Sequence, residues 1–178
     1  MKRVNILSWP KGGETEITAN KILDTFNNMQ SDIKAYELDF LNLSEDKLRS
    51  CDLLIVGGST IKDDNWLIAN NTTKWGQFFN FLRLTDLSGL KAAVFSIGDQ
   101  ELFPDNFVDG MSVIRNALAI KGARVIGYWP TESYDFNDSR SIEGDTFMGL
   151  VIDPINQPEL TDQRVHDWVY QLSSEIGL

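Results

Sequence analysis

The sequence predicts an α/β fold, a three-layer sandwich in which a parallel sheet carries helices on both faces. Short apolar runs bounded by turn residues alternate with segments of helical periodicity, the pattern of parallel strands joined by crossover helices. With 178 residues, 42% of them apolar and 24% charged, the chain is large enough for one full hydrophobic core. It contains no internal repeat and no low-complexity linker. We therefore expect residues 1–178 to form a single domain.

Five strands are expected from the apolar runs. Four of the runs are strongly apolar, and a weaker one lies between the first two and completes the alternation with helices. All are short, as the strands of a buried parallel sheet are. In chain order they are Val4–Leu7, Lys34–Leu38, Asp52–Val56, Lys91–Ile97 and Arg124–Gly127.

Four helices are expected from apolar residues spaced three and four positions apart. The first begins at about Thr15, and the last follows Thr161, its candidate N-cap. The third runs from about Phe107 to Lys121 and stops at Gly122. The stripes expected to face the core are Ile17, Ile22, Leu23 and Phe26; Trp75, Phe78, Phe79 and Leu82; Met111, Ile114, Leu118 and Ala119; and Val165, Trp168, Val169 and Leu172.

Two segments break the regular alternation. One is a long polar loop, Gly57–Thr73, and the other is an insertion, Tyr128–Leu150, placed after the fifth strand has begun. Long loops without regular structure are uncommon in compact domains and usually serve a function or are disordered. The first of these loops is therefore a candidate part of a binding site.

Composition and charge narrow the function classes. A formal net charge of −10 argues against nucleic-acid binding, which needs clustered Lys and Arg, and it suits basic partners or simple solubility. No apolar run approaches the roughly 20 residues of a membrane span, so we expect a cytoplasmic protein without a membrane partner. A lone Cys51 and a lone His166, far apart in sequence, offer neither a zinc site nor a disulfide, and Asp63–Asp64 is expected to be a solvated pair.

Three loops should meet at one edge of the sheet, because ligands of open parallel sheets bind outside the carboxyl ends of the strands. They are Ser8–Glu14, Gly57–Thr73 and Gly98–Asn106. The first carries Gly12 and Gly13 and precedes a helix, an arrangement whose free N–H groups and positive dipole end favour a phosphate. No acid–base or nucleophilic set accompanies these loops.

Three segments of the chain resemble the long-chain flavodoxins. They are DLLIVGGST, AAVFSIGDQELFPDNFVDG, and the stretch YWPTESYDFNDSRSIEGDTFMGLVIDPINQPELTDQRVHDWVYQLSSEIGL, which together span most of the chain from Asp52 onward. The resemblance implies a flavodoxin-like five-stranded parallel sheet of order 2-1-3-4-5, with an insertion in the fifth strand. It also implies a low-potential carrier of single electrons on non-covalently bound FMN, which needs no substrate-converting site because the cofactor supplies the chemistry. The expected partners are redox proteins with basic docking surfaces, and the expected state is a monomer.

The resemblance also assigns FMN-binding residues. The phosphate loop would be Pro10, Lys11, Gly12, Gly13, Glu14 and Thr15. One face of the flavin would be flanked by a loop that begins with Ser59, Thr60 and Ile61. The other face would be flanked by Gly98, Asp99 and Phe103, with Phe103 in the place of a ring-stacking tyrosine.

The phosphate loop departs from the family pattern, and this leaves alternatives open. Two hydroxyl positions are replaced by Pro10 and Gly12, each a loss of about 1.5–3 kcal/mol. Glu14 would repel a phosphate unless it turns outward, and Lys11 could partly compensate for the lost donors. One alternative is a flavodoxin-fold protein that has lost FMN and acts as a binding or regulatory module. Another is a different ligand, marked by Lys11 and the unusual aromatic residues Trp9 and Trp66.

Overall fold

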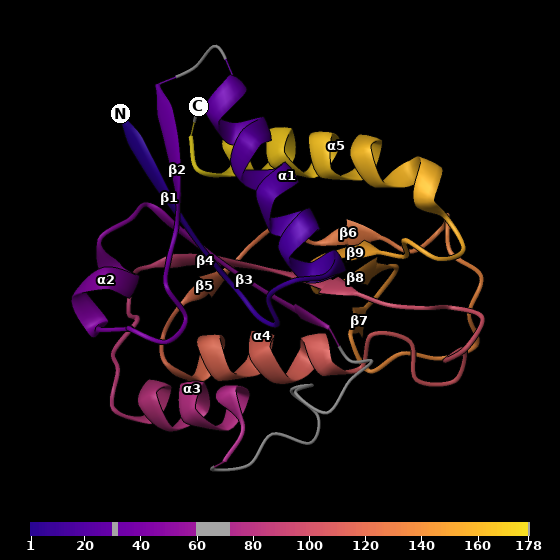
Figure 1. Ribbon diagram of the computed structural model, residues 1–178, viewed down its shortest axis with the longest axis horizontal. Coiled ribbons are helices and arrows are strands. Elements are labelled where there is room, and N and C mark those ends of the chain that lie inside the picture. Colours follow the sequence, from indigo (N-terminus) through magenta and orange to yellow (C-terminus); the bar gives the residue numbers. More distant parts are fainter. Residues whose placement is uncertain (30–31, 60–71, 178) are drawn as a thin grey trace.

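The computed structural model describes residues 1–29, 32–59 and 72–177 as an α/β sandwich (Figure 1). Its main strands are β1 (Lys2–Ser8), β2 (Ile33–Glu37), β3 (Leu53–Ser59), β4 (Lys91–Ile97), β5 (Arg124–Val125) and β9 (Leu150–Ile152). Its helices are α1 (Glu14–Asn28), α2 (Glu45–Arg49), α3 (Lys74–Arg83), α4 (Gly110–Ile120) and α5 (Thr161–Glu175), with a 3₁₀ turn at Pro158–Leu160 before α5.

The strands form a parallel sheet in the order β2-β1-β3-β4-β5, which confirms the predicted order. In the register of this sheet Leu7 lies beside Val56 and Val56 beside Val94, so apolar residues of the three central strands meet in rows. β9 pairs with β4 as well, from Phe95 to Ile97, beyond the two residues that pair with β5. The fifth strand position is therefore filled by two separate pieces of chain.

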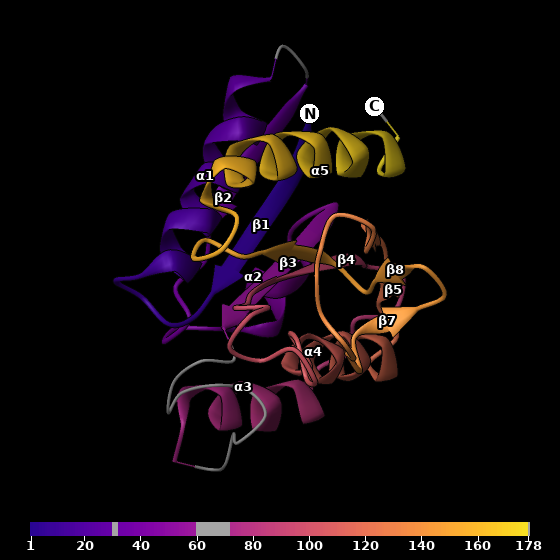
Figure 2. The same ribbon diagram turned by 90° about the vertical axis from the view of Figure 1, so that its right-hand side faces the viewer.

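The insertion lies between these two pieces. It contains β6 (Trp129–Pro130), β7 (Ile142–Glu143) and β8 (Thr146–Phe147), which form a small antiparallel sheet. Figure 2 places this sheet at the side of the molecule opposite α1 and β2. The predicted insertion in the fifth strand is confirmed, and its return brings β9 back to the edge of the main sheet.

Two hydrophobic clusters lie on the two faces of the sheet. One packs α1 and α5 against alternate strand residues such as Ile6 and Ile55, and its largest buried side chain is Trp168. The other packs α2, α3 and α4 against the intervening residues such as Leu54 and Val56. Figure 1 shows the same division, with α1 and α5 above the sheet and α3 and α4 below it.

Several local predictions are wrong. Gly57 and Gly58 belong to β3 instead of the following loop, because they pair with Phe95 and Ser96 of β4. Ile17 is 46% exposed and does not join the core stripe of α1. Thr161 is the first residue of α5 and makes no side-chain cap, since the 3₁₀ turn already leads into the helix.

Two single-residue expectations can be compared with the structure. Cys51 is a free, half-buried thiol that packs beside the hydrophobic cluster of α2, α3 and α4 and donates to the Leu48 carbonyl at 3.2 Å. His166 is an exposed residue of α5 that packs on the Tyr170 ring. Among the residues that the structure describes, no helix combines the length and the apolar character that crossing a membrane requires.

Candidate functional site

A cavity of about 310 Å³ opens at the carboxyl ends of the central strands. It lies where the loop between β1 and α1 meets the ends of β3 and β4 and the loop that follows β9. The structure therefore brings together the loop Pro10–Thr15 and Ser59, the described residue among the three assigned to the second loop. Its lining residues are Pro10, Lys11, Gly12, Gly13, Glu14, Thr15, Ser59, Ile97, Pro154 and Ile155.

The start of α1 forms one wall of this cavity and offers unpaired backbone donors. In the part of the chain that the structure describes, the N–H groups of Gly13, Glu14 and Thr15, like that of Glu16, have no hydrogen-bond partner, because the first intrahelical bond runs from Ile17 N–H to the Gly13 carbonyl. The Thr15 hydroxyl has none either, and its side chain is buried. These donors and the positive end of the helix dipole form a cradle suited to an anion.

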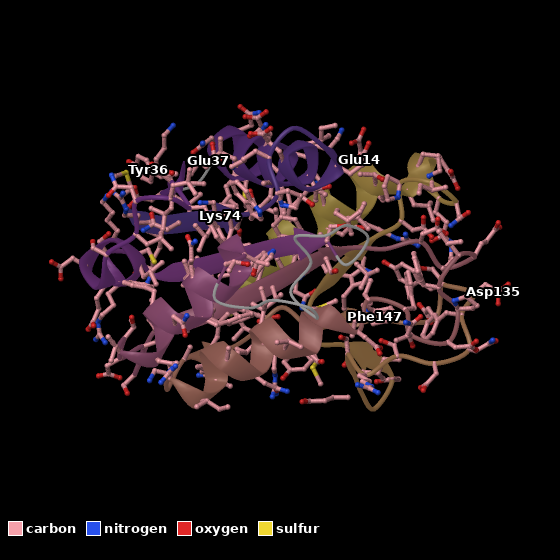
Figure 3. The ribbon with its side chains drawn as sticks, turned by 60° about the horizontal axis from the view of Figure 1, so that its bottom comes forward. Glu14, Tyr36, Glu37, Lys74, Asp135 and Phe147 are labelled. Atoms are coloured by element: carbon pink, nitrogen blue, oxygen red, sulfur yellow. The ribbon has the colours of Figure 1, made fainter. Side chains whose placement is uncertain are left out.

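The charged side chains around the loop are held mainly by other side chains of the protein, with Glu14 as the exception. Lys11 does not point its ammonium group freely into the cavity: it pairs with Glu37, lies 3.9 Å from Glu16 Oε1 and donates to Ser8 Oγ at 3.3 Å. The second carboxylate oxygen of Glu16 accepts the Gly12 N–H at 2.8 Å. Glu14 is exposed and has no partner within the described residues; Figure 3 labels it and Glu37, both in the upper part of the view with α1 and β2.

The loop is anchored to the sheet by its neighbours. The Trp9 N–H donates to the Gly57 carbonyl at 3.1 Å, and the Trp9 ring packs on Phe40 with 5.4 Å between ring centroids. Gly57 has to be a glycine, because a Cβ there would lie 1.9 Å from the buried Phe95 ring. Trp9 therefore supports the loop by packing against the hydrophobic cluster that α2, α3 and α4 form on one face of the sheet.

The loop after β4 is fixed to the loop after β9 by a buried polar network. The Asn156 side-chain amide donates to Asp99 Oδ1 at 2.8 Å and to Asp153 Oδ2 at 2.9 Å. The Asp153 carboxylate, which is fully buried, also accepts the N–H groups of Gln100 and Ile155 at 3.0 and 3.2 Å. Asp99 is thus buried and serves to hold Pro154 and Ile155 at the cavity edge.

A second polar cluster supports the same region from behind. The Arg164 guanidinium lies 4.0 Å from the centroid of the Tyr134 ring and donates to Gln157 Oε1 at 2.7 Å. Burial raises the pKa of the Tyr134 hydroxyl above its usual range, and burial lowers the pKa of Arg164. The Tyr134 hydroxyl donates to the Val151 carbonyl at 2.6 Å, so the cluster ties β9 to the insertion.

The other predicted site residues have different positions. Gly98 is packed so closely that a Cβ there would lie 2.6 Å from the side chains of both Phe107 and Val108, and it does not line the cavity. Phe103 is half-buried and its N–H donates to the Asp99 carbonyl, but it is not a lining residue of this cavity. Thr60 and Ile61 lie outside the described residues, as do Asp63, Asp64 and Trp66.

Comparison with known proteins identifies the family. A family model described as flavodoxin matches residues 6–168. The flavodoxin of Synechococcus elongatus is 34% identical over 178 residues and covers 100% of both chains, and flavodoxin 1 of Escherichia coli is 35% identical over 167 residues, 93% of this chain and 90% of that protein. The chain belongs to the flavodoxin family. A crystal structure of Fusobacterium nucleatum flavodoxin bound to flavin mononucleotide has the same fold, with a TM-score of 0.82, 24% identity, and coverage of 98% of this chain and 99% of that one.

The apolar side of the cavity in this flavodoxin was not predicted from the sequence. Ile97, Pro154 and Ile155 come from the end of β4 and the loop after β9, and Ile155 is 61% exposed beside the opening. The signal in the sequence was the apolar run Leu150–Ile152, which is typical of a second half of the fifth strand followed by a turn at Asp153–Pro154. In the described part of the chain, no three His, Cys, Asp or Glu residues lie close enough together to hold a metal ion.

Proposed function

We propose that this chain binds FMN at the cavity and carries single electrons between redox partner proteins. The observation that carries the proposal is the set of three unpaired N–H groups at Gly13–Thr15, which open into a cavity at the carboxyl ends of the strands of a flavodoxin. This is the location at which open parallel sheets hold nucleotides. The cradle fits the phosphate end of FMN, and the apolar wall fits part of its ring.

The proposed roles follow from the geometry. The three N–H groups and the Thr15 hydroxyl donate to the phosphate, and Ile97, Pro154 and Ile155 exclude water from the apolar side of the cavity. Ser59, Thr60 and Ile61 flank one face of the ring, and Gly98, Asp99 and Phe103 belong to the loop that flanks the other. When bound, the flavin ring supplies the one-electron chemistry, so the chain needs no substrate-converting site.

The proposed partners are redox proteins with basic docking surfaces. The formal charge of −10 attracts such partners over several ångströms and raises the association rate at low ionic strength. Leu102 and Ile155 are 64% and 61% exposed on the loops after β4 and β9, the two loops that Asn156 joins beside the cavity, and they add apolar contact area. We propose that the protein works as a monomer that meets these partners transiently.

The test is a titration of the flavin-free protein with FMN, followed by flavin fluorescence. We expect one FMN per chain and quenching on binding, and we expect Phe103→Ala to weaken binding and restore part of the fluorescence. The matched control is Phe81→Ala, the same truncation on the last turn of α3. If the protein neither quenches nor takes up added FMN, the chain is instead a flavodoxin that acts as a binding or regulatory module.

A further inference from the structure

We propose that Glu16 is a specificity-determining residue whose carboxylate competes with the ligand phosphate, so that this chain favours FMN over riboflavin less strongly than its open amides would allow. The proposal rests on the proposed function, because it concerns the phosphate end of the same cavity. It assigns a role to a residue that the phosphate-loop pattern Pro10–Thr15 does not include.

The first observation is that Glu16 occupies a donor of the loop. Its Oε2 accepts the Gly12 N–H at 2.8 Å, and Gly12 has a φ of +79°, a conformation that glycine adopts readily. The neighbouring N–H groups at Gly13, Glu14 and Thr15 have no partner among the described residues. A carboxylate therefore already holds one corner of the cradle that a phosphate would fill.

The second observation is that the loop's cation is neutralised. The Lys11 ammonium pairs with Glu37 on β2 and lies 3.9 Å from Glu16 Oε1. The same ammonium group also donates to Ser8 Oγ at 3.3 Å. Lys11 is thus committed to protein carboxylates before a ligand arrives.

Together these contacts leave the phosphate end acidic. Glu14, Glu16 and Glu37 lie in or beside the loop; Lys11 pairs with Glu37 and lies near Glu16, and Glu14 has no partner within the described residues. A phosphate with a charge between about −1.5 and −2 has to displace the Glu16 carboxylate from Gly12 or bind against its repulsion. Riboflavin has no phosphate and meets neither obstacle.

The experiment compares FMN and riboflavin dissociation constants for the full chain and two variants. Glu16→Gln keeps an oxygen that can accept the Gly12 N–H but removes the charge, and Glu16→Ala also vacates the amide. We expect each variant to bind FMN about tenfold more tightly, the size of one partly exposed charge-assisted contact, while riboflavin affinity changes less than about twofold. The matched control is Asp24→Asn, an exposed acidic residue about 12 Å further along α1, which should leave both constants unchanged.

Each outcome decides the proposal. Unchanged FMN affinity in both variants would overturn it, and so would an equal gain for riboflavin, because Glu16 would then act elsewhere than on the phosphate. Failure of the proposed function has a different signature, in which neither flavin binds any of the chains. Inorganic phosphate titrated against the Gly12 amide resonance then decides: saturation at lower phosphate concentration in Glu16→Ala supports the competition, and identical curves refute it.

Discussion

Replacement of Asn156 tests how the cavity edge is held in place. Its side-chain amide bridges two buried carboxylates, Asp99 and Asp153, which are 7% and 0% exposed. Asn156→Ala removes both donations and leaves the two carboxylates facing one another. Because Pro154 and Ile155 lie in the same turn and line the cavity, the change should affect both stability and ligand affinity.

The expected loss can be worked out from the contacts that remain. Two donations to charged groups are each worth about 1.5–3 kcal/mol, but Asp153 keeps three backbone donors and Asp99 keeps the Leu102 N–H at 2.9 Å. The two donations together are worth about 3–6 kcal/mol, and because the remaining donors compensate in part, we expect a loss just below this range, about 2–3 kcal/mol in the free energy of unfolding. For a chain of this length the melting temperature should fall by roughly 4–12 °C.

The assay is urea unfolding of the flavin-free protein, followed by FMN titration of each variant. Asn156→Asp adds a third carboxylate whose pKa should be raised by its two like-charged neighbours. Its stability should therefore match that of Asn156→Ala near pH 4 and fall below it as the pH rises through the raised pKa toward 7. The control is Asn116→Ala on the exposed side of α4, expected to cost under about 0.5 kcal/mol. A loss of that small size for Asn156→Ala, with unchanged FMN affinity, would refute the bridging role.

Two further predictions concern packing and a buried thiol. Gly57→Ala places a methyl group 1.9 Å from the Phe95 ring and should lower the free energy of unfolding, measured in urea, by about 1–3 kcal/mol. Phe95→Leu in the same chain should recover part of that loss. If the losses of the two substitutions simply add, the ring is not the obstacle. Burial raises the pKa of Cys51 to about 11, so at pH 8 the thiol should be alkylated about 100-fold more slowly in the folded protein than in the urea-unfolded chain. The free energy of unfolding should fall from about pH 9 to 11, and it should fall less steeply in Cys51→Ala than in the unchanged protein. Equal alkylation rates would contradict the burial of the thiol.

The alternation of strands and helices was predictable because each crossover leaves a local signature, an apolar run followed by a helical stripe, whereas the order of the strands was implied by the resemblance to the long-chain flavodoxins. One error arises where a distant part of the chain decides the outcome. Gly57 and Gly58 look like loop residues, yet pairing with Phe95 and Ser96 keeps them extended. Ile17 was predicted to face the core, but it precedes the buried Ile22 by five positions, which places it on another face of α1, and its side chain is 46% exposed.

The candidate site also has one part that could be predicted from the sequence and one part that could not. The loop Pro10–Thr15 could be found from sequence, because glycines followed by a helix start are consecutive in the chain. Ile97, Pro154 and Ile155 could not, since their approach to that loop depends on the return of β9 to β4 after the insertion. Asp99 lies in a recognisable segment, but only the position of Asn156, 57 residues later, reveals that its carboxylate is a structural acceptor.

The carboxylates of the loop show why a pattern of residue types cannot decide its charge. Glu14 stands inside the phosphate-loop pattern and looks like the residue that opposes an anion, yet it is exposed and unpaired within the described chain. Glu16 stands outside the pattern, and its position one turn after Gly12 lets its carboxylate fold back onto the Gly12 amide. Since Glu37 reaches the same loop from β2 through Lys11, the electrostatics depend on the pairing of β1 with β2 as well as on the loop. The affinity of this cradle for a phosphate is consequently set by the balance between the open amides of Gly13–Thr15 and the Glu16 carboxylate, while Lys11 is paired with Glu37 and lies near Glu16.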